Sequence, residues 1–343
     1  MKLAINGFGR IGRPALRRIL DKHPNIEIVA INDLTDPPTL AHLLRHDSTY
    51  GRYDKEVKVD GNNLIVDGRA ERGSSQAELG GKTIKILAEK DPANLPWKEL
   101  EIDVVLECTG LFTKLEGAQK HITAGAKKVV ISAPCDGDGI PTYLLGVNAD
   151  NYKGEAIISM GSCTTNCLAP IVKILNDNFT IEKGFMTTVH SYTNDQRILD
   201  LPHKDLRRAR AAGQNIIPTS TGAAKALGQC IPEIAGKLDG LAMRVPTPTV
   251  SITDFVCLVK KSATAQEINK LFTDAQMGDL KNILATSSEP LVSMDFKGNS
   301  NSSIVDLALT MSKENLIKVI SWYDNEWGYA CRLAEIADYI AMR

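Results

Sequence analysis

A glycine-rich turn between two short apolar segments constrains the fold more than any other feature of this chain. An apolar run at residues 2–5 leads into a turn in which Gly7, Gly9 and Gly12 have the spacing G-x-G-x-x-G. Glycines at this spacing allow a tight turn and let the backbone approach a pyrophosphate at the start of a helix. The turn therefore predicts a strand followed by a phosphate-binding helix.

The residues after the turn complete a dinucleotide-binding pattern. Ile11, Ala15 and Ile19 recur every four residues, which predicts a helix, and residues 26–31 form a second apolar strand that ends just before Asp33. An acid about 20 residues after the last glycine hydrogen-bonds the adenosine ribose. Its charge also repels a 2′-phosphate, so Asp33 favours NAD over NADP. A lone glycine motif is weak, but strand, helix, strand and acid together predict dinucleotide binding.

Strand and helix signals continue to alternate through the first half. Strands are predicted at 103–107 and 129–132, with a helix between them that starts at a capping box from Thr113 to Glu116. A largely parallel sheet follows, with Thr109 and Ser132 beside the cofactor at the carboxyl ends of strands. The glycine- and serine-rich stretch from Asp67 to Lys82 is interpreted as a surface insertion.

Cys163 lies at the predicted start of another helix. Small hydroxyl and amide residues surround it at 162–166, and an apolar helical pattern follows. Unpaired N–H groups at a helix start favour thiolate over thiol, but they contribute about 0.3 to 1 kcal/mol, less than the roughly 1.36 kcal/mol of one pKa unit. A reactive Cys163 therefore needs a second partner, for which a histidine is expected. The alternative is a small, buried and inert thiol.

The second half has a different pattern. Extended strands are predicted at 184–193, where His190 lies near the end, and at 250–259 and 317–323. These strands with intervening helices indicate an α+β domain. The last amphipathic helix, which contains Leu333 and Ile340, is expected to return to the first domain.

Three features of the second half are suited to anions. The hydroxyl-rich run 219–222 precedes a helix, whose N-terminus can hold phosphate. Arg244 stands before the proline-stiffened run 245–248, which aims its guanidinium. The basic run 203–210 is interpreted as a solvated or interface face rather than a nucleic-acid site.

Composition excludes several classes of function. The formal net charge of the 343 residues is −1, which gives no global attraction to nucleic acid or to an anionic membrane. The start of the chain is too short an apolar region for a signal peptide, and no apolar run reaches membrane-spanning length. Seven cysteines without disulfide-framework spacing suit the reducing cytoplasm. His42 and His46 have metal-ligand spacing but no third ligand nearby, so no metal site is predicted.

Taken together, the motifs closely resemble those of the phosphorylating glyceraldehyde-3-phosphate dehydrogenases along essentially the whole chain. The resemblance is carried by residues 6–13, 162–170, His190, 219–225, 244–248 and 321–329. It implies an α/β protein with a Rossmann NAD-binding domain over residues 1–162 and 327–343. Residues 163–326 would form an α+β catalytic domain with a mainly antiparallel or mixed sheet. It further implies a homotetramer that oxidises glyceraldehyde 3-phosphate with NAD and inorganic phosphate.

The resemblance also implies residue roles. Cys163 would be the nucleophile and His190 the base, with Cys167 packed behind. Thr193 and Arg244 would hold the phosphate of the substrate, and the attacking phosphate would be held by Ser162, Thr164, Thr221 and Gly222. The cofactor would contact Gly7, Gly9, Arg10, Ile11, Gly12, Asp33, Lys90, Ser132 and Asn325. Residues 195–214 would reach toward a neighbouring subunit.

The chain departs from the family pattern at a few positions, and alternatives stay open. Met160-Gly161 replaces a common Asn-Ala, and Lys90 stands where many bacterial members place an arginine near the adenine. An erythrose-4-phosphate dehydrogenase would share Cys163 and His190, but the retained Thr221-Gly222 favours triose phosphate. An NADP-preferring relative is disfavoured by Asp33 and by Leu201-Pro202. A nucleic-acid-binding role for the dinucleotide groove is a further alternative.

Overall fold

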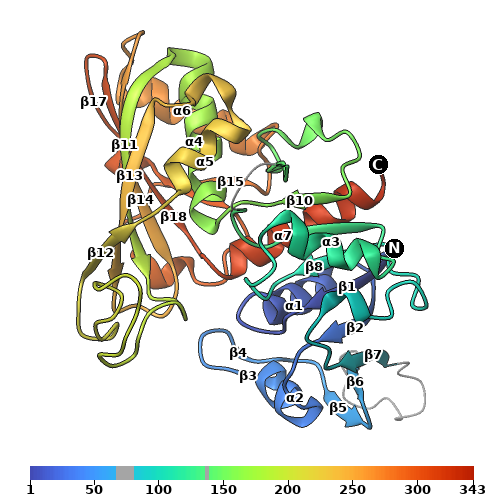
Figure 1. The fold of residues 1–343 in the computed structure, drawn as a ribbon. Coiled ribbons are helices and arrows are strands. Elements are labelled where there is room, and N and C mark those ends of the chain that lie inside the picture. The colour runs from blue at the N-terminus through green and yellow to red at the C-terminus, as the bar shows by residue number, and fades with distance from the viewer. Residues whose placement is uncertain (67–80, 136–138) are drawn as a thin grey trace, which may run out of the picture. The chain divides into compact units, whose positions relative to one another are not determined.

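The computed structural model describes residues 1–66, 81–135 and 139–343, which group into two compact units (Figure 1). The first unit comprises Met1–Ile140, Lys153–Ser159 and Leu333–Arg343, and the second comprises Pro141–Tyr152 and Met160–Arg332. The predicted insertion from Asp67 to Lys82 lies outside the described residues except for its last two positions.

One sheet organises the first unit, with strands in the order β10-β9-β8-β1-β2-β7-β6-β5. Neighbouring strands from β10 to β7 are parallel, whereas β7, β6 and β5 are antiparallel. The bounds are β1 Lys2–Asn6, β2 Glu27–Asn32, β5 Val57–Asp60, β6 Asn63–Val66, β7 Lys82–Leu87, β8 Val104–Glu107, β9 Lys128–Ile131 and β10 Ile157–Ser159. A short hairpin, β3 (His46–Asp47) with β4 (Gly51–Arg52), lies outside this sheet. The predicted Rossmann-type parallel core is confirmed.

The glycine turn after β1 has the conformation that its sequence predicts. Gly7 has a φ of +92°, and a Cβ there would lie 2.8 Å from the backbone of Cys108 and Thr109. A Cβ on Gly12 would lie 2.3 Å from the carbonyl oxygen of Gly7. Glycine is therefore required at both positions for β1 to turn tightly into the following helix.

The helices of the first unit are α1 (Gly12–Lys22), α2 (Pro37–Arg45) and α3 (Leu115–Thr123), with one short turn, η1 (Pro92–Asn94). The predicted capping box from Thr113 to Glu116 is wrong. The helix begins at Leu115, its N-cap is Lys114, and no side chain caps it. The acid therefore stands at the second helical position, where it cannot complete a box.

The last helix, α7 (Trp327–Ala341), runs from the second unit into the first. From Leu333 onward it belongs to the first unit, where Arg18 pairs with Glu335 at 3.1 Å and Lys128 Nζ donates to the carbonyl oxygen of Ile340 at 2.5 Å. The predicted return of this helix to the first unit is confirmed.

A second, mixed sheet forms the core of the second unit, with strands in the order β12-β13-β11-β14-β18-β16-β15 and with β17 paired to β18. The pairs β11–β13 and β15–β16 are parallel and the others are antiparallel. The bounds are β11 Ile181–Ser191, β12 Ile217–Ser220, β13 Leu238–Val245, β14 Ser251–Val259, β15 Leu284–Ser287, β16 Ser303–Asp306, β17 Met311–Lys313 and β18 Leu316–Tyr323. The predicted α+β architecture is confirmed.

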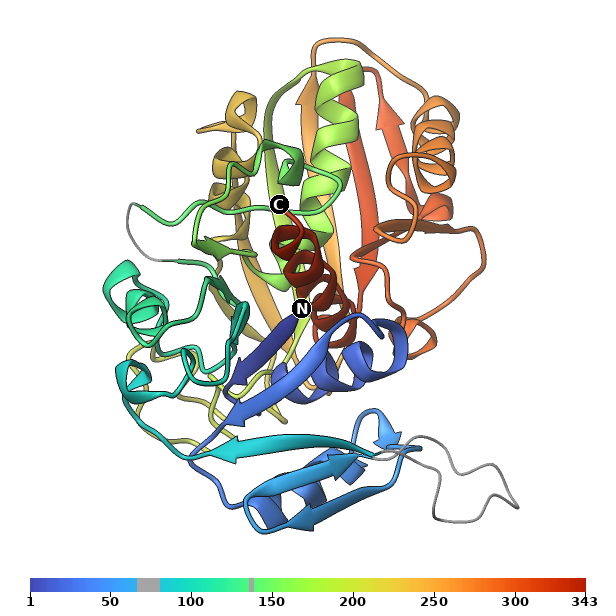
Figure 2. The same ribbon diagram turned by 90° about the vertical axis from the view of Figure 1, so that its right-hand side faces the viewer.

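Three helices lie on one face of this sheet (Figure 1). They are α4 (Cys163–Phe179), α5 (Ala223–Cys230) and α6 (Ala265–Met277), and the short turns are η2 (Ala149–Asn151), η3 (Pro232–Ile234), η4 (Ser293–Phe296) and η5 (Leu307–Leu309). Figure 2 shows α4, in light green, running along the strands. Its buried apolar side chains, including Leu168 and Ile171, explain why this stretch of sequence becomes a core helix.

The two units differ in extent from the predicted domains at 160–162, at 327–332 and, over the longest segment, at 141–152. That segment groups with the second unit, where Thr142 Oγ1 donates to Gln229 at 3.1 Å and Gly146 packs against Leu280. Contacts with α5 and with the segment after α6 thus hold a segment that lies in the first half of the chain.

Candidate functional site

Cys163 is the first residue of α4, as the sequence predicts. Ser162 caps the helix, and its Oγ accepts from the Thr165 N–H at 3.0 Å. Burial raises the pKa of the Cys163 thiol, whereas the positive charge of Arg244 and hydrogen bonds from Thr164 and from its own N–H act to lower it. The backbone N–H at the helix start is therefore one of several groups that favour the thiolate, whereas burial of the sulfur favours the thiol.

His190, near the end of β11, faces the thiol. Its Nε2 lies 3.5 Å from Cys163 Sγ, and its Nδ1 lies 2.7 Å from the Ser191 carbonyl oxygen. That carbonyl only accepts, so Nδ1 carries the proton and Nε2 presents its lone pair to the thiol. Burial, and then the charge of Arg244, lower the pKa of His190 to about 4. The ring is therefore neutral at neutral pH and presents Nε2 as an acceptor, but the two pKa shifts do not favour a resting thiolate–imidazolium pair.

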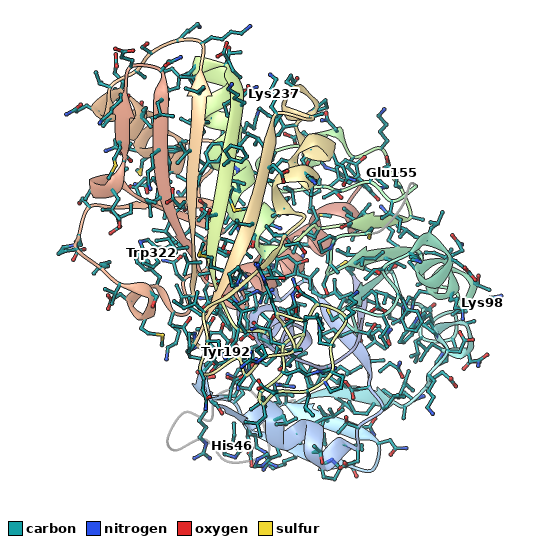
Figure 3. All side chains as sticks on the ribbon, turned by 60° about the vertical axis from the view of Figure 1, so that its left-hand side comes forward. His46, Lys98, Glu155, Tyr192, Lys237 and Trp322 are labelled. Carbon is teal, nitrogen blue, oxygen red and sulfur yellow. The ribbon has the colours of Figure 1, made fainter. Side chains whose placement is uncertain are left out.

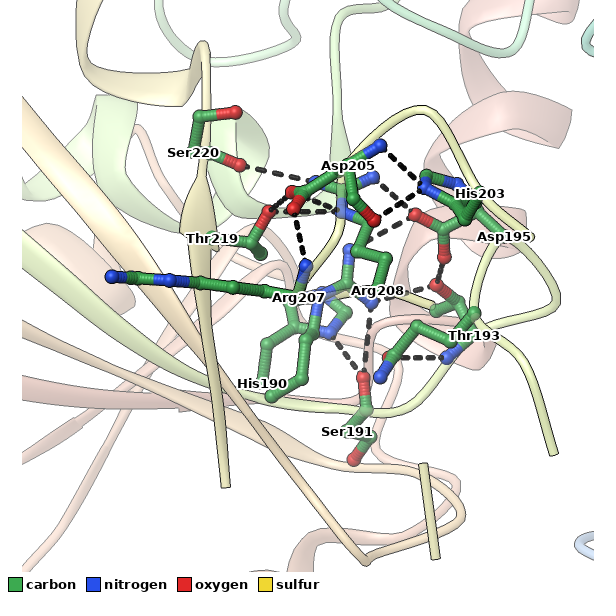
Figure 4. Close-up of polar contacts among 12 residues, drawn as sticks. His190, Ser191, Thr193, Asp195, His203, Asp205, Arg207, Arg208, Thr219 and Ser220 are labelled. Carbon is green, nitrogen blue, oxygen red and sulfur yellow. Dashed lines mark hydrogen bonds and ion pairs between the residues drawn. The ribbon is translucent and has the colours of Figure 1, made fainter. Parts of the chain in front are cut away.

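Arg244 lies beside His190 because β13 and β11 pair in parallel with these two residues in register. Its Nη1 donates to Thr193 Oγ1 at 2.6 Å and to the Ser191 carbonyl oxygen at 3.2 Å. The Thr193 hydroxyl in turn donates to Asp195, and an Asp195 oxygen lies 3.9 Å from Arg244 Nη2 (Figure 4). The guanidinium of Arg244 and the hydroxyl of Thr193 therefore lie beside His190, which faces Cys163.

Arg208 links this cluster to the hydroxyl-rich run at 219–222. Its guanidinium donates to Asp195, to Thr219 Oγ1 at 2.9 Å and to the Ser220 carbonyl oxygen at 3.2 Å (Figure 4). Beyond β12, Thr221 Oγ1 accepts from the Ala223 N–H at 3.2 Å, and Gly222 is the N-cap residue of α5. The predicted anion features therefore converge within the second unit.

Sequence reasoning missed Asp195, Arg208 and Tyr323 as parts of this site. Tyr323 OH lies 2.8 Å from both Thr164 Oγ1 and Thr188 Oγ1, and its ring meets that of His190 edge-on at 5.9 Å. The hydroxyl of Thr164 is therefore turned into the protein. The position of Asp195, two residues after Thr193, was an available signal, but nothing in the basic run 203–210 singled out Arg208.

Cys167 lies one helical turn after Cys163 and is fully buried. Its sulfur is 3.7 Å from the hydroxyls of Thr253, Ser303 and Ser321, and burial raises its pKa to about 11. All seven cysteines fall in described ranges, and none of them is in a disulfide.

The predicted cofactor residues of the first unit lie at the carboxyl ends of its parallel strands. Asp33 follows β2, and its Oδ2 accepts from the Phe8 N–H of the glycine turn at 2.8 Å. Gly9 has open space where a Cβ would stand. Ser132 follows β9, and its N–H donates to the Glu107 carbonyl oxygen at 2.9 Å. An open turn, a helix start and a ribose-directed acid fit a dinucleotide.

The other predicted cofactor residues have different surroundings. Arg10 Nη1 lies 2.5 Å from Asp47 Oδ2, and Ile11 is the N-cap residue of α1. Lys90 is exposed. In the second unit Asn325 is buried, and its Oδ1 accepts from Ser251 Oγ at 2.9 Å. That bond orients the amide so that its N–H group faces away from Ser251.

Neither metal nor membrane features emerge from the part of the chain that the structure describes. The rings of His42 and His46 are 4.9 Å apart, but within that part no three His, Cys, Asp or Glu side chains group as metal ligands. None of its helices has the length and apolar character needed to cross a bilayer.

Comparison with known proteins agrees with this arrangement. Residues 1–115 match the family model of the glyceraldehyde 3-phosphate dehydrogenase NAD binding domain, and residues 162–325 match that of the C-terminal domain. The chain belongs to the glyceraldehyde-3-phosphate dehydrogenase family. It is 56% identical over 346 aligned positions to glyceraldehyde-3-phosphate dehydrogenase of Geobacillus stearothermophilus and to glyceraldehyde-3-phosphate dehydrogenase 1 of Bacillus subtilis, covering 100% of this chain and 99% of each relative.

A cyanobacterial relative extends the family likeness. Glyceraldehyde-3-phosphate dehydrogenase 2 of Synechocystis is 52% identical, with 99% of this chain and 98% of the relative covered. The two family models thus match segments of both units, and the match to the NAD binding domain includes the glycine turn and Asp33.

Proposed function

We propose that this protein is an NAD-dependent, phosphorylating glyceraldehyde-3-phosphate dehydrogenase. The observation that carries the proposal is the 3.5 Å contact between Cys163 Sγ and His190 Nε2 beside the Arg244 cluster, in a chain that has the family's NAD binding domain. The reaction converts glyceraldehyde 3-phosphate and inorganic phosphate into 1,3-bisphosphoglycerate. Relatives of 50% identity or more bear the triose phosphate name, which disfavours the erythrose-4-phosphate alternative and a nucleic-acid role.

In the first step Cys163 gives its proton to His190 Nε2, and its sulfur forms a bond to the aldehyde carbon. The carbonyl oxygen, held by the Cys163 N–H, takes that proton back from His190 and becomes the hydroxyl of a thiohemiacetal. NAD, when bound, supplies the acceptor for the hydride that leaves this carbon. As the hydride leaves, His190 takes the hydroxyl proton and a thioester to Cys163 remains. An oxygen of inorganic phosphate then attacks the thioester carbon, the carbon–sulfur bond breaks, and Cys163 leaves as thiolate.

Two subsites are proposed for the two phosphates. Arg244 and Thr193 would hold the phosphate of the substrate, because Arg244 already places a guanidinium N–H on the Thr193 hydroxyl. Ser162, Thr164, Thr221 and Gly222 would hold the attacking phosphate, with Thr164 acting through its backbone because its hydroxyl bonds Tyr323. Arg208 adds a cation next to the run that contains Thr221. Occupied by phosphate, this second subsite also keeps water from the thioester.

We propose that NAD contacts Gly7, Gly9, Arg10, Ile11, Gly12, Asp33, Lys90, Ser132 and Asn325. The glycine backbone and the α1 N-terminus suit the pyrophosphate, and Asp33 suits the adenosine ribose. The N–H group of Asn325 suits a carbonyl acceptor such as the nicotinamide carboxamide. The Asp33 carboxylate, fixed by the Phe8 N–H, favours NAD over NADP.

A homotetramer is proposed for the assembly, supported by exposed apolar side chains. Ile198 and Leu206 are 85% and 82% exposed within the segment 195–214 that was predicted to reach a neighbouring subunit. Phe185 is 73% exposed on the sheet face opposite to α4 and lines a cavity of about 600 Å³ together with Lys237. Figure 3 labels Lys237 at one end of this sheet. Exposed patches of this kind mark protein interfaces.

Two further assignments concern the location of the protein and its domain boundaries. A cytoplasmic location is supported by the seven cysteines, none of which is in a disulfide, as suits a reducing compartment. The domain boundaries 1–162 with 327–343, and 163–326, are kept for the NAD-binding and catalytic domains.

The test is the formation of reduced nicotinamide from glyceraldehyde 3-phosphate, with and without inorganic phosphate. Sustained turnover that requires phosphate is expected. Faster NAD reduction with erythrose 4-phosphate than with the triose would reject the substrate assignment, and a higher kcat/KM with NADP would reject the cofactor preference.

A further inference from the structure

A fully buried carboxylate lies beneath the glycine turn of the first unit. Glu107 ends β8, and its side chain has no exposed surface. Oε1 accepts from the backbone N–H of Thr109 at 2.7 Å and also from its hydroxyl, while Oε2 accepts from Asn6 Nδ2 at 2.5 Å. The fourth contact, to Oε2, comes from His121 Nε2 at 3.1 Å. Donors surround both oxygens, which suits the ionised, acceptor-only carboxylate.

The neighbouring tryptophan determines which nitrogen of His121 faces Glu107. Trp97 Nε1 lies 3.0 Å from His121 Nδ1. An indole N–H only donates, so Nδ1 accepts and Nε2 carries the ring proton. His121 therefore donates to Glu107, and Trp97, His121 and Glu107 form a directed chain of hydrogen bonds.

This chain of hydrogen bonds continues to the ends of neighbouring strands. Asn6, the last residue of β1, accepts at its Oδ1 from Asn32 Nδ2 at 2.7 Å. Asn32 ends β2, and its side chain bonds both the N–H and the carbonyl oxygen of Glu89, each at 2.9 Å. One connected set of bonds thus ties the carboxyl ends of β1, β2 and β8 to the segment after β7.

The ends of β1 and β8 meet where the Gly7 turn lies against the loop 109–111. The Thr109 hydroxyl, which donates to Glu107, accepts from the Leu111 N–H at 3.0 Å and so holds the loop 109–111 in place. That loop lies against Gly7, where a Cβ would come within 2.9 Å of the Thr109 side chain. A displacement of Thr109 would therefore move the surface against which the turn rests.

We propose that Glu107 is a positioning residue for NAD. It touches no cofactor atom itself; it fixes the separation between the Gly7 turn and the loop 109–111, so that the cofactor meets both in their binding geometry. The inference rests on the proposed function because it takes NAD as the occupant of this strand edge. It differs from a purely structural role because the predicted cost falls on NAD affinity.

The test compares Glu107→Gln with Val105→Ala, a variant on the same strand. Glutamine has the same shape, but its NH2 group faces either the Thr109 donors or the pair Asn6 and His121, so that donor meets donor. Val105 is buried in the apolar core of this unit, and its truncation lowers stability without touching the polar chain. NAD affinity is measured by titration calorimetry on cofactor-free protein, alongside the thermal midpoint and kcat at saturating NAD.

In Glu107→Gln we expect a Kd for NAD about tenfold higher than in the wild type, equivalent to about 1.4 kcal/mol. Its kcat at saturating NAD should stay within about twofold of the wild-type value, because the substitution weakens NAD binding equally in the ground state and in the transition state. Val105→Ala should keep the wild-type Kd despite a lower thermal midpoint. An unchanged Kd in Glu107→Gln would overturn the inference. Failure of the wild type to bind NAD would instead reject the proposed function.

If Glu107→Gln does not fold, Asn6→Ala serves in its place. It removes the 2.5 Å bond to Glu107 and the acceptor of Asn32, and the Asn6 side chain is buried below the turn. A Kd raised by a similar factor supports the inference, and a Kd equal to that of Val105→Ala contradicts it.

Discussion

The contact between Cys163 and His190 makes a quantitative prediction for the substitution His190→Asn. Asparagine removes the Nε2 lone pair that lies 3.5 Å from the sulfur. Burial raises the pKa of the Cys163 thiol above its ordinary value of 9.0, and the variant has no base to take the proton. Less than about 1% of such a thiol is ionised at pH 7. The rate of Cys163 alkylation in the variant should then rise about tenfold for each pH unit between 7 and 9.

The wild type should behave differently over the same range. Because burial lowers the pKa of His190 to about 4, the ring is unprotonated above that pH and its Nε2 lone pair is available as a general base while the sulfur attacks. General bases contribute about 10²–10⁴-fold, so the wild type should be alkylated at least about 100-fold faster than the variant at pH 7. The wild-type rate should also depend less steeply on pH.

The assay is the second-order rate of reaction with iodoacetamide from pH 5 to pH 9. Cys163→Ser measures the background from the other thiols, of which Cys167, Cys230 and Cys257 are buried. Superimposable pH profiles for the wild type and His190→Asn would refute the reasoning, because they would show that His190 does not take the thiol proton.

Three further outcomes follow from the same geometry. Cys163→Ser should reduce turnover to background while the Kd for NAD, measured by calorimetry, stays at the wild-type value. A loss of NAD affinity would contradict this prediction. Arg244→Lys replaces a planar guanidinium, whose Nη1 bonds Ser191 and Thr193, by a shorter side chain with a single charged nitrogen, so the KM for glyceraldehyde 3-phosphate should rise about 10–100-fold in steady-state assays; an unchanged KM would count against the substrate subsite. Gly240→Ala should lower kcat/KM more than it lowers the alkylation rate, and equal losses would point to general unfolding.

The sequence predicts the local features of this protein well. The glycine turn, the strands on both sides of it and the helix that begins at Cys163 are each specified by neighbouring residues, through backbone freedom at glycine, apolar periodicity and the Ser162 cap. The predicted capping box at Thr113 fails because the N-cap lies one residue later, at Lys114, which changes which positions can cap. Short-range patterns locate elements well and their first residues less well.

Contacts between distant residues could not be read in this way. Glu107 lies 101 positions from Asn6 and 14 from His121, and their meeting depends on the order of strands in the sheet. Arg208 is one of several cations in a run whose members look alike in sequence, yet it bonds Asp195, Thr219 and Ser220. Tyr323 reaches Thr164 from the last strand of the second sheet. Only the folded chain identifies these residues.

The register of two parallel strands explains why the proposed base and the proposed phosphate ligand act as one unit. His190 and Arg244 are paired across β11 and β13, so the distance between them is set by the sheet rather than by loops. That spacing depends on a close approach four residues earlier, where Gly240 faces Met186 and a Cβ would lie 2.2 Å from the Met186 carbonyl oxygen. A side chain at Gly240 would force the strands apart, at a cost of about 1–3 kcal/mol for overpacking. The displacement would move Arg244 relative to His190 while α4 still presents Cys163, which is why substrate recognition should suffer more than thiol reactivity.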